Sequence, residues 1–193
     1  MKRILVFSDL HASKRALEDI IPSLEKVDLS ICCGDFLGYG KDIDYCLEYV
    51  LKNIDLIVIG NHERLAITNE NLEKQPPAVK ESILNLRDKL SLEQKKALSA
   101  LPKEIWYQDM YIAHSIGDEY LRNKSDFLQF HANLAKDVKY VFFGHTHEQV
   151  LFKFEERVIV NPGSITKGRG GSERGFVLTN GDKFEFIKLE AIL

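Results

Sequence analysis

The sequence predicts an α/β fold built around a parallel sheet. Continuous apolar runs at Ile4–Phe7, Leu29–Cys33 and Leu56–Ile59 are typical of strands that are buried on both faces. The segments between them carry apolar residues at helical spacing, and each run ends abruptly in polar residues. A strand, helix, strand, helix, strand order with short connections gives a parallel sheet covered by helices.

Two helices separate these strands, and a longer helical region follows them. We expect one helix from about Ser13 to Lys26, with Ser13 as its N-cap, and another from Asp42 to Asn53. Residues 64–101 are expected to be mostly helical and to lie near the functional site. Pro76-Pro77 breaks this helical excursion, and a capping box at Ser91–Gln94 starts a helix that runs to Leu101.

The second half of the chain is expected to be richer in strands. A helix is expected over Ser125–Ala135, and Asn180-Gly181 is a strong hairpin turn signal. The expected strands are Glu104–Tyr107, Met110–Ala113, Val138–Phe143, Gln149–Phe154, Arg157–Val160, Gly175–Thr179 and Lys183–Leu189. The sequence has no repeat or linker, so we expect residues 1–193 to form a single domain.

Composition limits the classes of function. Hydrophobic residues make up 45% and charged residues 28% of the 193 residues, as in ordinary globular domains. The net charge of −3 gives no basic field, which argues weakly against large nucleic acids. No apolar run approaches the ~18 residues of a membrane span. The three cysteines have no Cys-x-x-Cys spacing, which favours a cytoplasmic protein without a zinc knuckle or redox pair.

Metal-binding residue types gather at the predicted strand ends. Five of the six histidines lie there, together with carboxylates and an amide. Carboxylate plus imidazole suits Zn²⁺, Mn²⁺, Fe and similar ions, and so many ligands exceed the needs of one tetrahedral ion. The sequence therefore predicts two metals, ~3.5–4 Å apart as in two-metal hydrolases. The residues are Asp9, His11, Asp35, Asn61, His62, His114, His145 and His147.

Each of these residues alone has a structural alternative, such as a cap or a turn, and the functional interpretation depends on the whole set. For other conspicuous residues the structural interpretation is preferred. His131 is expected at the surface or in packing, and Cys32 and Cys33 in the core. A solvated loop is favoured over substrate binding for Lys167, Arg169 and Arg174. Tyr39 is open between packing and stacking on a substrate group.

The motifs resemble a known family. Asp9-x-His11, Gly34-Asp35, Gly60-Asn61-His62-Glu63, His114 and Gly144-His145-x-His147 look like the five signature blocks of the calcineurin-like metallophosphoesterases. Gly34–Gly40 and Asn161–Ser164 resemble the small YfcE-like phosphodiesterase group. One departure is Ala113-His114-Ser115, where many members have a glycine beside the histidine; the ligand is retained and only the loop shape differs.

The resemblance implies a fold and a site. The fold would be a four-layer αββα sandwich, with two mixed β-sheets flanked by helices. One metal would be held by Asp9, His11, Asp35 and His147, and the second by Asp35, Asn61, His114 and His145. Asp35 would bridge the two ions, because its carboxylate has two oxygens. His62 would face the substrate, and His62, Asp35 and Asn61 would be the catalytic residues.

The expected function is a dimetal phosphodiesterase that cleaves a small phosphodiester by in-line attack of a metal-bridging hydroxide. Two alternatives stay open: a phosphomonoesterase or nucleotide phosphatase of the same fold, and a catalytically silent protein-interaction scaffold. Mn²⁺ is the preferred ion, with Ni²⁺, Co²⁺, Fe²⁺, Zn²⁺ and Mg²⁺ as alternatives. We expect no membrane partner, and the resemblance leaves a homodimer open. Residues 64–101 and 115–136 are expected to shape specificity.

Overall fold

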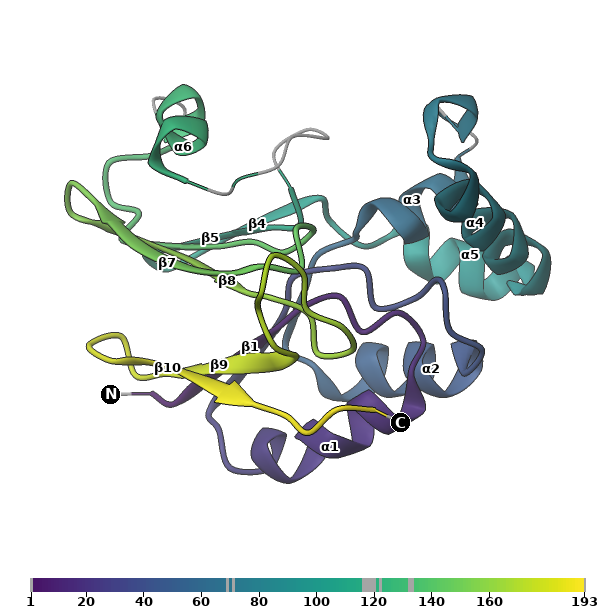
Figure 1. The fold of residues 1–193 in the computed structure, drawn as a ribbon, viewed down its shortest axis with the longest axis horizontal. Helices are drawn as coiled ribbons and strands as arrows, with labels where there is room; N and C mark the ends of the chain where they lie inside the picture. The colour runs from purple at the N-terminus through teal and green to yellow at the C-terminus, as the bar shows by residue number, and fades with distance from the viewer. Residues whose placement is uncertain are drawn as a thin grey trace.

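Two five-stranded sheets lie face to face between layers of helices in the computed structural model (Figure 1). The structure describes residues 2–68, 70, 72–115, 121, 123–131 and 134–192, with the backbone alone at 129 and 131. From bottom to top in Figure 1 the layers are α1 and α2, the first sheet, the second sheet, and α6. The predicted αββα sandwich is confirmed.

The first sheet contains the predicted parallel strands. Its order is β10-β9-β1-β2-β3, in which β1, β2 and β3 are parallel and β9 and β10 are antiparallel additions. The strands are β1 (Ile4–Phe7), β2 (Leu29–Cys32), β3 (Leu56–Ile57), β9 (Gly175–Thr179) and β10 (Phe184–Lys188). The sheet therefore joins the start of the chain to its end.

The second sheet is also mixed. Its order is β4-β5-β6-β8-β7, with β5, β6 and β8 parallel and antiparallel strands at both edges. The strands are β4 (Glu104–Tyr107), β5 (Met110–Ala113), β6 (Tyr140–Phe142), β7 (Gln149–Phe154) and β8 (Arg157–Pro162). The parallel strands of this sheet bring the ends of β5, β6 and β8 to one edge.

The helices cover the outer faces and one end of the sandwich. α1 and α2 pack on the first sheet, α6 packs on the second, and α3, α4 and α5 gather beside the strand ends (Figure 1). The helices are α1 (Lys14–Leu24), α2 (Ile43–Asn53), α3 (Asn61–Ile67), a 3₁₀ turn (Leu72–Lys74), α4 (Pro77–Lys89), α5 (Leu92–Ser99) and α6 (Lys124–His131). In this described part of the chain, the helices are too short or too polar to cross a bilayer.

The central strands are buried on both faces, which explains their continuous apolar runs. In β1, Leu5 and Phe7 pack against the helices, whereas Val6 points between the sheets. In β5, Ile112 lies between the sheets and Tyr111 packs under α6. The predicted core positions of Cys32 and Cys33 are confirmed, because both are fully buried.

Some predicted boundaries are wrong. The third strand contains only Leu56–Ile57, because the N–H of Ile59 donates to Pro102 O, 2.9 Å away, outside the sheet. The helical region begins at Asn61, three residues before the predicted start at residue 64. The described part of α6 begins at Lys124 and ends at His131, and the side chain of His131 and residues 132–133 lie outside the described residues. The other predicted elements are present with ends shifted by a few residues.

Candidate metal centre

The loops after β1 and β2 pair along their backbones. The N–H of Asp9 donates to Gly34 O at 3.1 Å, and the N–H of His11 donates to Asp35 O at 3.0 Å. The loops are therefore fixed relative to each other before any side chain is considered. This pairing holds Asp9 and Asp35 side by side at the strand ends.

Most of the predicted ligands have strained backbones. Five of them have φ in the left-handed region, which residues other than glycine rarely adopt: Asp9 (56°), His11 (49°), Asp35 (50°), His145 (70°) and His147 (60°). Each such conformation costs of order 1–3 kcal/mol and clusters at functional sites. Tyr39, with φ of 47°, shares this signature although it is not a predicted ligand.

Two glycines allow the loops to approach closely. A Cβ at Gly60 would lie 2.1 Å from Asp35 Oδ1, and a Cβ at Gly34 would lie 2.9 Å from Gly60 Cα and from His114 Nδ1. Gly34 also has a φ of +89°. Any side chain at either position would push these loops apart and separate Asp35 from His114.

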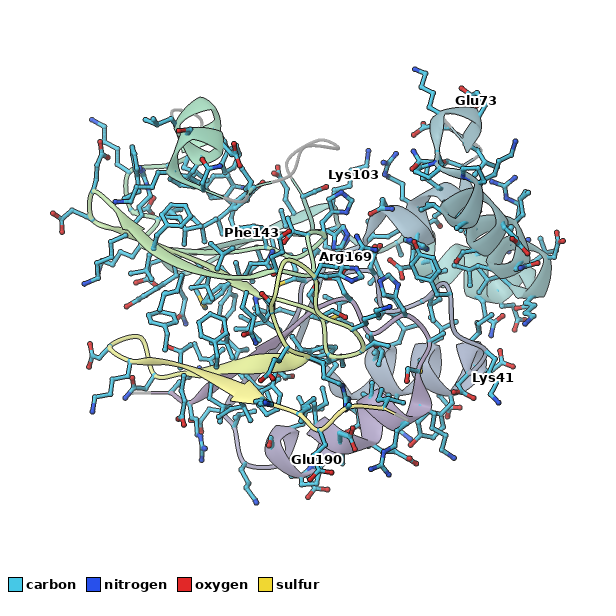
Figure 2. The ribbon with its side chains drawn as sticks, in the orientation of Figure 1. Lys41, Glu73, Lys103, Phe143, Arg169 and Glu190 are labelled. Carbon is cyan, nitrogen blue, oxygen red and sulfur yellow. The ribbon has the colours of Figure 1, made fainter. Side chains whose placement is uncertain are left out.

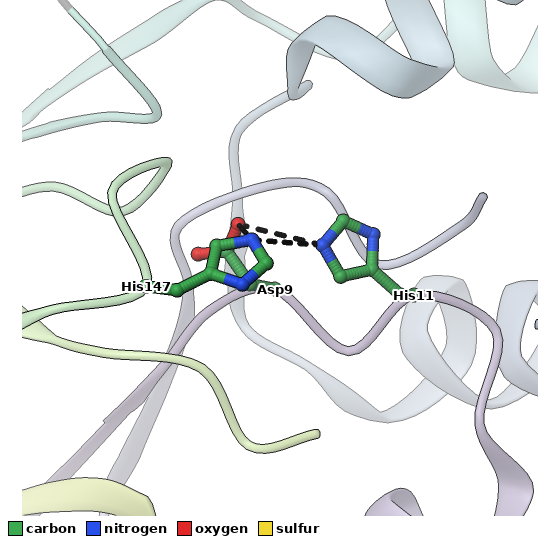
Figure 3. A group of neighbouring side chains, drawn as sticks. All are labelled: Asp9, His11 and His147. Atoms are coloured by element: carbon green, nitrogen blue, oxygen red, sulfur yellow. Dashed lines mark hydrogen bonds and ion pairs between the residues drawn. The ribbon is translucent and has the colours of Figure 1, made fainter. Parts of the chain in front are cut away.

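Asp9, His11 and His147 form the first cluster of candidate ligands (Figure 3). The Nε2 atoms of His11 and His147 are 3.0 Å apart, and His147 Nε2 is 3.0 Å from Asp9 Oδ1. Their outer ring nitrogens contact backbone carbonyls: His11 Nδ1 contacts Leu37 O at 3.3 Å, and His147 Nδ1 contacts Lys167 O at 3.1 Å. These carbonyls orient both Nε2 atoms toward Asp9.

Asp35, His114 and His145 form the second cluster. His114 Nε2 is 3.2 Å from Asp35 Oδ2 and 3.1 Å from Asn61 Oδ1. The outer nitrogen, His114 Nδ1, is 2.7 Å from the carbonyl of Cys33. The backbone N–H of His145 donates to Asp9 Oδ2 at 3.1 Å, which ties this cluster to the first.

His62 lies between the clusters. It forms a third group with His11 and Asp35, and its Nε2 is 4.0 Å from Asp35 Oδ2. Its ring centroid is 5.0 Å from that of His11 and 4.6 Å from that of Tyr39. Asp35 accepts the N–H of His62 through the other oxygen, Oδ1, at 2.9 Å. Asp35 thus belongs to two of the three groups, and His11 links them to the first cluster.

The charges in the centre suit a cation. Burial lowers the pKa of His11 to about 3 and that of His145 to about 4, so both imidazoles are neutral and present lone pairs. Burial opposes the charge on Asp9, but His147 outweighs it and lowers the pKa of Asp9 to about 2. Asp9 Oδ1 is buried and, within the described structure, accepts no hydrogen bond. Such an oxygen is costly unless a cation neutralises it, so the donor set fits a bound metal.

His114 and Asp35 behave as an ion pair. Burial alone would lower the pKa of His114, but the Asp35 carboxylate outweighs burial and raises it to about 10. The same pairing holds the pKa of Asp35 well below its usual range in spite of burial. A metal ion at this cluster would therefore displace a proton from His114.

Glu63 was not predicted as part of the centre. Its fully buried carboxylate accepts backbone N–H groups from Leu37 at 2.6 Å, Asp35 at 3.2 Å and Gly60 at 2.9 Å. Burial and the neighbouring Asp35 charge raise the pKa of Glu63 to about 8. Glu63 thus holds two ligand loops together and caps α3. The Gly-Asn-His-Glu motif contained this residue, but its partners are distant in sequence.

Asn161 and Ser164 were also not predicted to act in the centre. Asn161 Nδ2 donates to Gly144 O at 2.8 Å and to Thr146 Oγ1 at 3.0 Å, which fixes the loop that carries His145 and His147. The hydroxyl of Ser164 donates to Asp9 O at 2.8 Å. Their position in an Asn-Pro-Gly-Ser turn directly after an apolar strand was the available signal.

The preferred solvated-loop interpretation is wrong for Arg174. Its guanidinium is buried, donates to Ile165 O at 2.7 Å, and pairs with Asp19 at 2.9 Å. Lys167 and Arg169 are exposed, but their backbones contact His147, through Lys167 O and through the Arg169 N–H at 2.9 Å. This loop therefore supports the first cluster of ligands.

Known proteins are similar to this chain in sequence and in fold. A family model described as the calcineurin-like phosphoesterase superfamily domain matches residues 1–183. The chain is 23% identical to the uncharacterized protein MJ0912 of Methanocaldococcus jannaschii, over 87% of this chain and 78% of the relative. A metallophosphoesterase from Sphaerobacter thermophilus superposes with a TM-score of 0.79 at 24% identity, over 97% of this chain and 89% of that one.

Two more distant structures are named for an activity. YfcE, a phosphoesterase from E. coli, matches with a TM-score of 0.57 at 17% identity, over 96% of this chain and 92% of that one. An archaeal phosphodiesterase matches with a TM-score of 0.57 at 19% identity, over 97% of this chain and 99% of that one. At these identities the likeness demonstrates a common fold.

Proposed function

Because the chain belongs to the calcineurin-like phosphoesterase superfamily, we propose that it is a phosphodiesterase that works with two divalent metal ions. Asp9, His11 and His147 would hold one ion, and His114, His145 and Asn61 the other. Asp35 would contact both. The phosphodiesterase-like fold of structural neighbours supports the choice of a diester.

One observation carries the proposal above all others. Donor atoms of buried carboxylates and imidazoles converge to within 4.8 Å in separate groups, and Asp35 belongs to two of them. Buried groups of this kind are stable only when paired or coordinated to a metal. Asp9 Oδ1 accepts no hydrogen bond although His147 Nε2 lies 3.0 Å away, which supports coordination of both atoms to one ion.

The chain's own residues would orient the reaction. When bound, two divalent ions neutralise phosphoryl oxygens and lower the pKa of coordinated water. His62, whose pKa burial lowers, is a neutral hydrogen-bond donor that would face the departing ester oxygen. Asn61 would orient the phosphoryl group through its amide. Glu63 would keep the Asp35 and Gly60 loops at the separation that these contacts require.

The ion and the compartment follow from chemistry. An oxygen and imidazole donor set accepts Mn²⁺, Fe²⁺, Co²⁺, Ni²⁺ and Zn²⁺, and we take Mn²⁺ as the first choice. All three cysteines are free and buried, which supports a reducing compartment such as the cytoplasm. The substrate would be a small phosphoester. A homodimer stays a prediction that size-exclusion chromatography tests.

The test is hydrolysis of bis(p-nitrophenyl) phosphate beside p-nitrophenyl phosphate. Metal-free protein is assayed alone and then with Mn²⁺, Ni²⁺, Co²⁺, Mg²⁺ and Zn²⁺ in turn, with Asp35→Ala as control. The expected result is metal-dependent diester cleavage that the control loses. Faster cleavage of the monoester would replace the diesterase with a phosphomonoesterase. Two bound ions without cleavage of either ester would favour a protein-interaction scaffold.

A further inference from the structure

A cavity of about 480 Å³ opens directly beside the second cluster. Its lining includes Asn61 and His114, both predicted ligands of one ion. Arg64, Lys103, Glu104 and Phe130 line the same cavity. Pockets of about 300–1,000 Å³ hold ligands much larger than a single phosphate group. A phosphate bound at the ligands would therefore have space for one of its ester arms here.

The charged side chains of the cavity favour an anion. Arg64 and Lys103 are cationic, and the carboxylate of Glu104 accepts the hydroxyl of Tyr111 at 2.6 Å. Arg64, whose side chain is 18% exposed, also pairs at 3.3 Å with Glu70, whose side chain is 62% exposed. An anion in the cavity would share Arg64 with this partner. The two cations Arg64 and Lys103 of the cavity contrast with the chain's net charge of −3.

Lys103 is placed to reach such an anion. It is exposed and lies immediately before β4, at the end of the sandwich that carries the ligand loops (Figure 2). Arg64 comes from α3 and lines the same cavity. Two cations from separate elements therefore line one cavity, as expected for a subsite that binds a second charge.

The remaining walls suit a ring-bearing group. The ring of Tyr111 contacts Phe130 at a centroid distance of 5.4 Å and Trp106 at 4.7 Å, so this wall is a fixed aromatic row. Ala113 lies on the same face of β5 as Tyr111 and presents only a methyl group next to His114. A large residue at this position would fill the space that the cavity leaves beside the ligands.

We infer that this cavity binds one arm of the substrate, and that the arm is a ring-bearing group that carries a second phosphate or similar anion. This inference rests on the proposed function, because the cavity is assigned to the substrate on the ground that the candidate metal ligands Asn61 and His114 line it. Arg64 and Lys103 would bind the second anion, and the aromatic row and Ala113 would accommodate the ring. The substrate class is thus narrower than small phosphodiesters in general.

The first experiment measures binding. Calorimetry on the Mn²⁺-loaded protein compares thymidine 3′,5′-bisphosphate with thymidine 5′-monophosphate, which lacks the second phosphate. We expect the bisphosphate to bind more tightly. Lys103→Ala and Arg64→Gln should each reduce this preference about 10-fold, the loss expected for one charge-assisted hydrogen bond. Lys183→Ala, an exposed lysine in the turn before β10, should keep the preference within about twofold.

The second experiment measures turnover. Thymidine 5′-(p-nitrophenyl phosphate) is compared with the same ester carrying a 3′-phosphate. In Lys103→Ala the KM for the 3′-phosphorylated ester should rise, while kcat for both esters and the KM of the simpler ester are kept. Lys103 is exposed, so its truncation leaves the packed core untouched.

The outcomes separate the two proposals. Equal binding of the two nucleotides by the wild type, or a preference that Lys103→Ala and Arg64→Gln leave unchanged, would overturn the subsite even if diesters are cleaved. A preference that depends on both residues would support the subsite. If that preference is found but no ester is cleaved with any metal, the proposed catalytic function fails and the anion-binding cavity stands.

Discussion

The two halves of the candidate centre are held together by different means. In the N-terminal half, the loops after β1 and β2 share backbone hydrogen bonds, and the buried carboxyl group of Glu63 joins the loop after β2 to the start of α3. In the C-terminal half, neutral side chains hold the loop after β6: Asn161 spans it, and Ser164 links the neighbouring turn to Asp9.

The difference lies in the side-chain anchors. β1 and β2 are adjacent and parallel, so their loops leave the sheet in the same direction and come close enough for main-chain hydrogen bonds. The same holds for β5 and β6, where the N–H of Gly144 donates to His114 O at 3.0 Å. What differs is the added anchor, which is Glu63 in the N-terminal half and Asn161, from β8, in the C-terminal half. Glu63, whose pKa is raised to about 8, is an ionisable anchor that acts on the electrostatics of the candidate ligands once it loses its proton, whereas the amide of Asn161 acts on loop geometry alone.

Asp35→Asn should have the largest effect on activity, because Asp35 lies on a loop of the N-terminal half and also pairs with His114 of the C-terminal half. An amide keeps the volume but removes the charge that pairs with His114 and the second anionic oxygen. We expect metal-dependent diester hydrolysis to fall about 10⁴-fold or more, since several kcal/mol of charge stabilisation are lost. Metal content by mass spectrometry should fall to one ion or fewer. Retention of two ions with near-normal turnover would contradict the shared role.

His62→Gln separates chemistry from metal binding. His62 belongs to the N-terminal half but lies 4.0 Å from Asp35 Oδ2, farther than the predicted ligand His114 at 3.2 Å. We expect kcat to fall about 100- to 1,000-fold while two ions are kept, as for removal of a general acid or hydrogen-bond donor. The effect should be smaller for a diester with a p-nitrophenolate leaving group than for one with an alkoxide. Loss of one ion in the variant would instead make His62 a ligand.

The convergence of the candidate ligands and most elements could be predicted because their signals are local. A residue such as Asp9 directly after a buried apolar run needs no tertiary information to be placed at a strand end. The two mixed sheets came from the family resemblance, and their strand order was not predicted, since antiparallel additions such as β9 beside β1 join distant parts of the chain. The residue types and their positions at the strand ends then indicated that these side chains converge at one site.

The roles of Glu63 and Arg174 were not predicted, because both depend on partners that are distant in the sequence. Glu63 accepts N–H groups from residues 26 and 28 positions earlier, and Arg174 pairs with Asp19, 155 positions away. The start of the helical region at Asn61 was misplaced by three residues because its N-cap, Gly60, has no side chain to signal it. In each case the deciding contact forms only after the strands have assembled.

Glu63→Gln and Asn161→Ala compare the anchors of the two halves directly. In Glu63→Gln an amide NH₂ must face a backbone N–H, so one of the three contacts is lost beside Asp35. We expect metal affinity, measured by calorimetry, to fall about 10- to 100-fold, as for other residues that hold metal ligands in place. Asn161→Ala should mainly lower the free energy of unfolding, by about 1–3 kcal/mol, because buried carbonyls lose their donor. Equal losses of metal affinity in the two variants would show that the ionisable carboxyl group of Glu63 does no more than hold the loops in place.

The smallest expected effect is on the pH dependence of stability. It tests the ion pair between His114, from the C-terminal half, and Asp35, from the N-terminal half. The pKa of His114 is raised from 6.5 to about 10 in the folded metal-free protein, so its contribution to stability is full below pH 6.5 and is lost as pH rises through about 10. We expect the melting temperature of metal-free protein to fall over this window, and to fall less in His114→Gln. Metal affinity should change in the opposite direction and increase with pH, because an ion must displace the same proton. An unchanged slope in His114→Gln would mean that the two halves are held together without this ion pair.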